Sequence, residues 1–128
     1  MILDSSAVIA ILLREPGYEQ LERWVGRERS PGIGAPTLAE TAIVLTGKTG
    51  ALGRTLLNRF LITMEVEMIP FGDEHWRMAV EAYDHYGKGR HRAGLNFGDC
   101  LTYAVAKLAH EPLLALGDDF GHTDLELA

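Results

Sequence analysis

Short apolar runs alternate with longer segments of helical periodicity along the whole chain. Apolar residues that recur every three or four positions predict helices near residues 5–14, 18–27, 36–47, 52–65, 73–86 and 96–110. The runs between them predict strands at residues 1–3, 32–35, 66–71 and 112–116, with a last edge strand at 123–127. The pattern is therefore one of strands that alternate with helices.

Two of these helices carry large apolar side chains on one face. Asp73 and Asn96 are suitable capping residues for the starts of the last two helices. We expect Trp24 and Trp76 to take part in core or dimer packing rather than in base stacking. The side chains that should face the core are Leu21, Trp24 and Val25 in the helix at 18–27, and Trp76, Ala79, Val80 and Tyr83 in the helix at 73–86.

Strands that alternate with helices of ten or more residues are typical of βαβ units, in which parallel strands lie under helices on both faces. We therefore predict an α/β fold in three layers, with a mainly parallel central sheet. The chain has 128 residues and no linker rich in Gly, Pro or Ser, so a single domain over residues 1–128 is expected. Ligands of such sheets bind beyond the carboxyl ends of the strands, near the point where strand order reverses.

The composition fits a folded globular protein, because 47% of the residues are hydrophobic and 23% are charged. The single cysteine, Cys100, has no partner for a disulfide within the chain, which favours a reducing, cytoplasmic setting. The apolar run at 7–13 is far shorter than the ~20 residues that cross a bilayer, and no basic segment precedes it. We expect neither a signal peptide nor a membrane span.

The net charge of −6 argues against a nucleic-acid partner, since binding to phosphates normally needs a basic surface. Three basic residues nevertheless gather between two predicted helices, where Lys88, Arg90 and Arg92 fall within five positions. Such a loop beside an acidic metal site could steer phosphates toward it. Taken alone, the cluster is more simply a solvated loop.

Acidic residues stand where predicted strands end and predicted helices begin. Asp4 follows the first strand, and Asp118 and Asp119 follow the strand at 112–116. Glu40 and Asp99 lie in the first turns of their helices. Because helices that connect parallel strands begin at the rim where the strands end, we expect these carboxylates to meet at one end of the molecule.

Each acidic residue also has a purely structural interpretation. Asp4 and the Asp118–Asp119 pair suit caps and turns, Thr37 and Glu40 have the spacing of a capping box, and Asp99 complements a helix dipole. Gathered at one rim, however, the carboxylates would repel one another unless a cation lay among them. Mg²⁺ prefers hard oxygen ligands and keeps several waters, so it is the expected cofactor.

Several segments resemble the VapC toxins of bacterial toxin–antitoxin pairs, which are PIN-domain ribonucleases. The Asp-Ser-Ser at the start and the Asn-Phe-Gly-Asp segment are the most specific parts of this resemblance. The matching segments follow the same order along nearly the whole chain: MILDSSAV from Met1, LAET from Leu38, YGKGRH from Tyr86, LNFGDC from Leu95 and GDDF from Gly117.

The resemblance implies a PIN-like fold and a Mg²⁺-dependent endoribonuclease, with Mn²⁺ as a substitute ion. The acidic positions of the family carry over to Asp4, Glu40, Asp99 and Asp119. Asp4 and Asp99 would be the main direct ligands, while Glu40 and Asp119 would position waters or a second ion. Relatives often place an aspartate where Gly117 stands, so Asp118 remains the alternative to Asp119.

The resemblance also implies roles for residues near the acidic positions, and it implies binding partners for the protein. A small hydroxyl residue near the metal falls on Ser6, which would position a water. An equally good interpretation is a helix-terminal serine that bonds to backbone amides. Lys88, Arg90 and Arg92 would contact RNA phosphates. The expected partners are RNA, a second copy of the chain, and a cognate VapB-type antitoxin that inserts a segment into the active-site groove.

Two other functions stay open at this point. A PIN fold without activity would serve as a binding module, although intact acids at every expected position favour the nuclease. A phosphotransfer enzyme with a doubly wound sheet also gathers acids at strand ends. Ser6 stands where an aspartyl-phosphatase would carry a second aspartate, and Pro70–Phe71 stand where a receiver domain would carry one.

Overall fold

Four short strands and six helices follow one another along the chain, and a computed structural model describes all 128 residues. None of the helices combines the length and the apolar character that crossing a membrane requires. The elements are β1 (Ile2–Leu3), α1 (Ser5–Leu12), α2 (Tyr18–Arg27), β2 (Gly32–Gly34), α3 (Ala35–Thr49), α4 (Ala51–Thr63), β3 (Glu67–Ile69), α5 (Asp73–Tyr86), α6 (Phe97–Ala109) and β4 (Leu113–Leu114), followed by a 3₁₀ turn, η1 (Phe120–His122).

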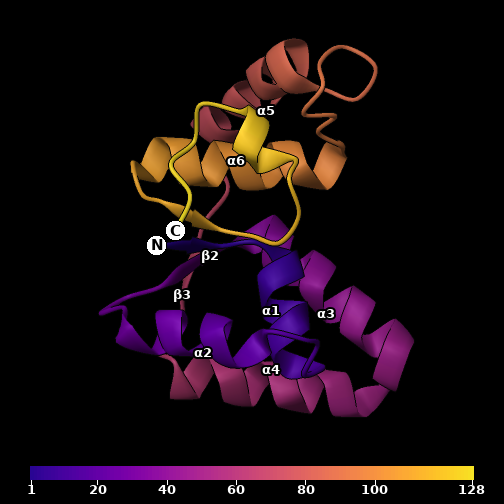
Figure 1. The fold of residues 1–128 in the computed structure, drawn as a ribbon, viewed down its shortest axis with the longest axis vertical. Helices are drawn as coiled ribbons and strands as arrows, with labels where there is room; N and C mark the ends of the chain where they lie inside the picture. The colour runs from indigo at the N-terminus through magenta and orange to yellow at the C-terminus, as the bar shows by residue number, and fades with distance from the viewer.

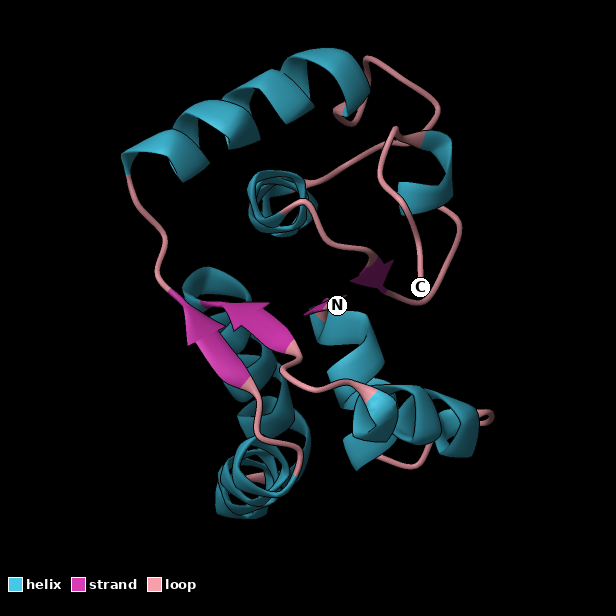
Figure 2. Cartoon of the chain, turned by 90° about the vertical axis from the view of Figure 1, so that its left-hand side faces the viewer, coloured by secondary structure: helices cyan, strands magenta, loops and turns pink.

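The sheet is entirely parallel, with strand order β3-β2-β1-β4. Ile2 of β1 pairs with Gly32 on one side and with Leu113 on the other. In Figure 2, β2 and β3 run side by side in the same direction. The chain moves outward from β1 through β2 to β3 and then returns to place β4 on the other side of β1. Strand order therefore reverses between β1 and β4, which is where a ligand site is expected.

The alternation of side chains along the two inner strands builds two separate cores. Ile2 and Leu113 belong to the core under α5 and α6, whereas Leu3 and Leu114 belong to the core beneath α1, α2 and α4. Adjacent residues of a strand point to opposite faces of its sheet, so two-residue strands can serve both cores. Figure 1 shows α5 and α6 on one side of the strands and α1 to α4 on the other. The predicted three-layer α/β/α fold is confirmed.

The prediction of which face of α5 is buried was wrong. Ala79 is buried, but Trp76, Val80 and Tyr83 are 47%, 52% and 44% exposed. The small residues Ala79 and Ala82 pack against α6 instead, and the larger side chains form a stripe beside that contact. Helical periodicity identifies an apolar stripe, but it does not reveal which part of the stripe another element covers.

A similar difference occurs on α2, where Leu21 and Val25 are buried but Trp24 is 38% exposed. The indole stands at the edge of the buried face, one position before Val25. Neither tryptophan is part of the core, so of the two roles expected for them the core role is wrong and the role in dimer packing stays a prediction.

The predicted edge strand at 123–127 does not form. The chain turns through η1 and returns to β4 for one isolated bridge, between Leu113 and Leu127. The Leu113 amide donates to the Glu126 carbonyl and the Ala128 amide donates to the Leu113 carbonyl, at 2.9 Å each. Because the C-terminal tail pairs with β4 at a single residue, it covers that edge of the sheet but does not add a fifth strand.

Candidate active site

Asp4 is a buried carboxylate at the switch point of the sheet. It follows β1 directly, caps the N-terminus of α1, and is only 6% exposed. Its Oδ2 accepts hydrogen bonds from the Ser6 amide at 3.1 Å and the Ser6 hydroxyl at 2.6 Å. Its Oδ1 accepts one from the Thr102 hydroxyl at 3.0 Å. The capping interpretation is therefore confirmed, and the same bonds hold the carboxylate in one orientation.

Ser6 joins the two strand ends on either side of the switch point. Its hydroxyl donates to Asp4 and accepts a hydrogen bond from the Leu116 amide at 3.0 Å. The serine therefore bonds to a backbone amide, but one that lies 110 residues away rather than in its own helix. A water-positioning role for this hydroxyl stays a prediction.

Glu40 lies in α3 and faces the first turn of α6. The helix begins at Ala35, so Thr37 is already inside it and the capping box expected between Thr37 and Glu40 does not form. A Cβ atom built at Gly98 would lie 2.6 Å from Oε2 of Glu40, closer than normal contacts allow. The exposed Glu40 carboxylate thus packs directly against the backbone of α6 at Gly98.

Asp99 lies in the first turn of α6 and forms a capping box with Asn96. The Asn96 amide donates to Oδ2 of Asp99 at 3.0 Å, and the Asp99 amide donates to Oδ1 of Asn96 at 2.9 Å. Burial raises the pKa of Asp99 above its ordinary value of 3.8, and the negative charges of Asp4, Asp119 and Glu40 raise the pKa further against the lowering effect of the Asn96 amide. Asp99 is therefore a helix cap that also lies within the electrostatic reach of the three other acids.

Asp119 acts on Asp99 more strongly than its neighbour does. Both Asp118 and Asp119 are exposed in the turn after β4, where Gly117 has a φ of +87°. Among the charges that raise the pKa of Asp99, Asp119 is present and Asp118 is not. The choice of Asp119 over Asp118 as the fourth acidic residue stays a prediction.

None of the salt bridges in the structure includes Asp4, Glu40, Asp99 or Asp119. No three His, Cys, Asp or Glu side chains are placed to hold a metal ion by themselves. Mg²⁺ needs only one or two direct carboxylates when waters complete its shell, so the oxygen-only donors at this rim fit such an ion. The salt bridges of the structure join other groups, namely the Met1 ammonium with Glu28 and Glu111, Arg77 with Asp73, and Lys107 with Asp124.

The basic loop between α5 and α6 is closed at its base by a bridge between Gly87 and Leu95. Lys88, Arg90 and Arg92 are exposed, and the Arg90 guanidinium lies 4.9 Å from the centre of the Tyr83 ring. Figure 1 shows this loop running from the end of α5 to the start of α6, the helix that carries Asp99. The three cations thus lie on the segment that leads into the acidic site.

The family of the chain follows from its similarity to known protein families. The model of the PIN domain matches residues 1–126. The chain belongs to the PIN-domain family. Ribonuclease VapC36 from Mycobacterium tuberculosis is 46% identical to this PIN domain over 127 residues, which cover 98% of this chain and 91% of the relative. An identity this high over nearly the full length places the domain among the VapC proteins, as the sequence motifs predicted.

Solved structures share the fold at lower sequence identity. One is VapC20 from Mycobacterium tuberculosis, a toxin described as cleaving the sarcin-ricin loop, with a TM-score of 0.79, 16% identity, and coverage of 99% of this chain and 97% of that chain. Another is VapBC2 from Rickettsia felis bound to a promoter DNA fragment, with a TM-score of 0.76, 18% identity, and coverage of 99% and 96%. These matches confirm the architecture of the PIN domain.

Three residues of this PIN domain contribute to the site without having been predicted from the sequence. Thr102 bonds to Asp4, Thr37 bonds to Thr102 at 2.9 Å, and Gly98 provides the space for Glu40. The spacing of the two threonines from the acidic residues could have indicated their role. Thr102 lies three residues after Asp99, and Thr37 lies three residues before Glu40, so each threonine shares a helix face with an acidic residue.

Proposed function

We propose that this protein is a Mg²⁺-dependent endoribonuclease that acts as the toxin of a VapBC-type toxin–antitoxin pair. The observation that carries the proposal is that the charges of Asp4, Asp119 and Glu40 all act on Asp99, while none of these four carboxylates forms a salt bridge. Relatives that are named VapC ribonucleases support the choice of RNA as substrate. The single free cysteine, which is buried, is consistent with the cytoplasmic location that we include in the proposal.

The carboxylates divide into two pairs by burial. Asp4 is buried and Asp99 is half-buried, so these two are the proposed direct ligands of the ion. Glu40 and Asp119 are exposed and are proposed to orient waters or a second ion, and Ser6, which bonds to Asp4, is proposed to position a water. When bound, Mg²⁺ (or Mn²⁺ in its place) supplies a Lewis acid that neutralises phosphodiester charge and lowers the pKa of water. Burial is the main cause of the raised pKa of Asp99, and the neighbouring negative charges, which such an ion would offset, raise the pKa further.

RNA binding is proposed to use the exposed cations of the loop that precedes α6. Lys88, Arg90 and Arg92 lie on the segment that leads into the acidic rim, where they can hold phosphates on either side of the scissile bond. Neutralising Arg92 to Ala is expected to weaken RNA binding and to flatten its dependence on salt, measured by fluorescence anisotropy over a salt series. An unchanged salt slope would count against the loop as the phosphate contact.

The central test is cleavage of mixed RNA by the purified protein with Mg²⁺ or Mn²⁺, compared with a chelator. Asp4→Asn and Asp99→Asn are expected to abolish cleavage, while Asp119→Asn should reduce it more than Asp118→Asn does. Asp84→Asn is the matched control, because Asp84 is exposed on α5 and forms no salt bridge. RNA that stays intact with folded, metal-loaded protein would favour a PIN fold that only binds.

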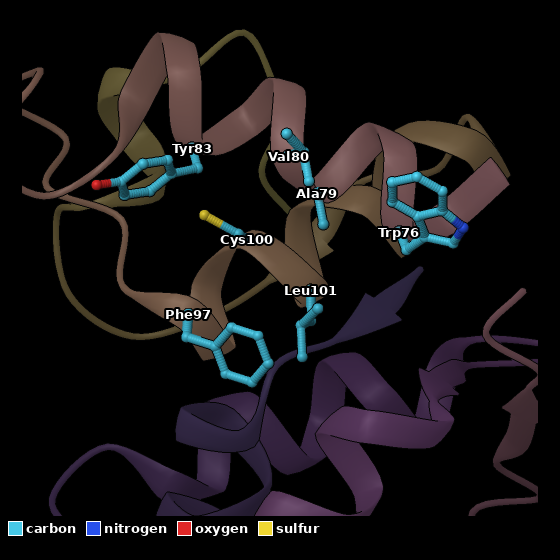
Figure 3. Close-up of a pocket in the computed structure, with 7 residues that line it drawn as sticks. All are labelled: Trp76, Ala79, Val80, Tyr83, Phe97, Cys100 and Leu101. Carbon is cyan, nitrogen blue, oxygen red and sulfur yellow. The ribbon is translucent and has the colours of Figure 1, made fainter. Parts of the chain in front are cut away.

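A second copy of the chain is the partner we propose for the apolar face formed by α5 and α6. Trp76, Val80 and Tyr83 line a hollow of about 370 Å³ together with Phe97, which is 81% exposed (Figure 3). Exposed apolar patches of this kind usually mark protein interfaces. Arginines lie over Trp76 and Tyr83, and Glu40 lines a neighbouring hollow with Phe97, so opposite charges flank the face and suit pairing about a two-fold axis.

Sedimentation analysis tests this dimer directly. Val80→Asp is expected to give a monomer, whereas Ile62→Asp, which introduces the same charge at a 78% exposed position on the opposite layer, should leave the dimer intact. A Val80→Asp protein that still sediments as a dimer would exclude this face. The cognate antitoxin is the further proposed partner, supported by the toxin–antitoxin complexes among the structural neighbours.

A further inference from the structure

Asp4 stands at the end of a chain of buried hydroxyl groups. The Thr102 hydroxyl lies 3.0 Å from Oδ1 of Asp4, and the Thr37 hydroxyl lies 2.9 Å from that of Thr102. Both threonines are almost fully buried, at 1% and 3% exposure. A hydroxyl has one proton to donate, and an ionised carboxylate can only accept. Thr102 therefore donates to Asp4 and must accept from Thr37, which gives the chain a single direction.

The hydrogen bonds also determine which part of Asp4 remains available to a ligand. A carboxylate offers about four acceptor positions, two on each oxygen. Both positions of Oδ2 are taken by the amide and the hydroxyl of Ser6, and one position of Oδ1 is taken by Thr102. The remaining acceptor position belongs to Oδ1, the oxygen that Thr102 orients.

The same two threonines connect the helices that carry the other acids. Thr102 lies one turn after Asp99 on α6, and Thr37 lies one turn before Glu40 on α3. Their hydroxyls meet across the α3–α6 contact, and Glu40 packs on Gly98 at the same contact. The chain of hydroxyls thus joins three of the four elements that supply carboxylates.

We propose that Thr37 and Thr102 are positioning residues that hold Oδ1 of Asp4 ready to bind a divalent cation by a single oxygen. The proposal rests on the metal-dependent function proposed above and adds to it two residues that never touch the substrate. Residues that hold a metal ligand in place typically change metal affinity by about 10–100-fold when they are removed. Neutral hydroxyls that only satisfy each other in the core would change stability but not affinity.

The test is the affinity of the full chain for Mn²⁺, measured by calorimetry without RNA. Thr102→Val removes the hydroxyl with little change in shape and is expected to weaken Mn²⁺ binding at least about tenfold. Thr102→Ser should restore binding to near the wild-type level, and Thr37→Val should have a smaller effect because Thr102 can still donate to Asp4. Thr41→Val is the matched control, since Thr41 is also buried in α3 but donates only to the Thr37 carbonyl.

Wild-type affinity in a folded Thr102→Val protein, or a Thr102→Ser protein as weak as Thr102→Val, would overturn the proposal. A urea-unfolding cycle of Thr37→Val, Thr102→Val and the double variant without metal supplies the second measurement. The hydroxyl chain predicts that the double variant loses less stability than the two single variants together. If wild type binds no Mn²⁺ while this coupling is present, the metal-dependent function has failed rather than the hydrogen-bond chain.

Discussion

Gly98 offers a substitution that should stabilise the protein and impair its proposed activity at the same time. A Cβ at this position would lie 2.6 Å from Oε2 of Glu40, whereas ordinary contact begins near 3.4 Å, so the carboxylate must retreat by about 0.8 Å. The backbone at Gly98 is helical and needs no positive φ, so Gly98→Ala adds helix propensity worth roughly 0.5–1 kcal/mol. For a domain of this size that gain raises the melting temperature by about 2–5 °C.

The activity should move in the opposite direction. Displacing a group by about 1 Å can reduce a rate by roughly a hundredfold, so Gly98→Ala is expected to cleave RNA at least about tenfold more slowly. Gly47→Ala is the matched control, because Gly47 is also helical and a Cβ there meets nothing within 4 Å. It should gain similar stability and keep full activity.

Calorimetry measures the melting temperature of both variants, and a Mn²⁺-supported assay measures their rates of RNA cleavage. A Gly98→Ala protein that cleaves at the wild-type rate would show that the place of Glu40 beside α6 is not needed for catalysis. A Gly98→Ala protein that melts below wild type would show that the carboxylate cannot move aside, and would refute the stability argument.

Two further predictions concern charge. The raised pKa of Asp99 means that this residue's own contribution to the stability of metal-free protein is greatest below about pH 3.8 and is lost as pH rises through the folded-state pKa. Asp99→Asn should therefore melt higher than wild type at pH 7 in chelator and equally near pH 3, and calorimetry that finds it lower at pH 7 would contradict the crowding of charges. In the C-terminal tail, the Lys107 ammonium and the Tyr103 hydroxyl lower the pKa of Asp124. Tyr103→Phe should reduce the unfolding free energy by about 1 kcal/mol at pH 7 in urea titrations, with a difference that shrinks as Asp124 becomes protonated. A difference that does not depend on pH would refute this reading.

Many interactions between near neighbours were predicted from the sequence, although Thr37 and Glu40 form no capping box and α5 has Gly72, not the predicted Asp73, at its cap position. The helix at 18–27 has the expected bounds, and Asn96 caps α6 as its position before Phe97 indicated. Asp4 and Asp99 were placed at helix starts because capping involves residues only two or three positions apart. The parallel sheet followed from the alternation of strands and helices, which is also a local pattern.

Only the folded chain decided which acid faces which neighbour and which apolar stripe stays uncovered. Thr102 is 98 residues from Asp4, and the Leu116 amide is 110 residues from Ser6, so no local pattern links either pair. The exposure of Trp76 depends on how closely Ala79 and Ala82 let α5 approach α6. Caps and periodicity arise within one turn of the chain, whereas these contacts arise from the packing of separate elements and exist only once the sheet has brought the elements together.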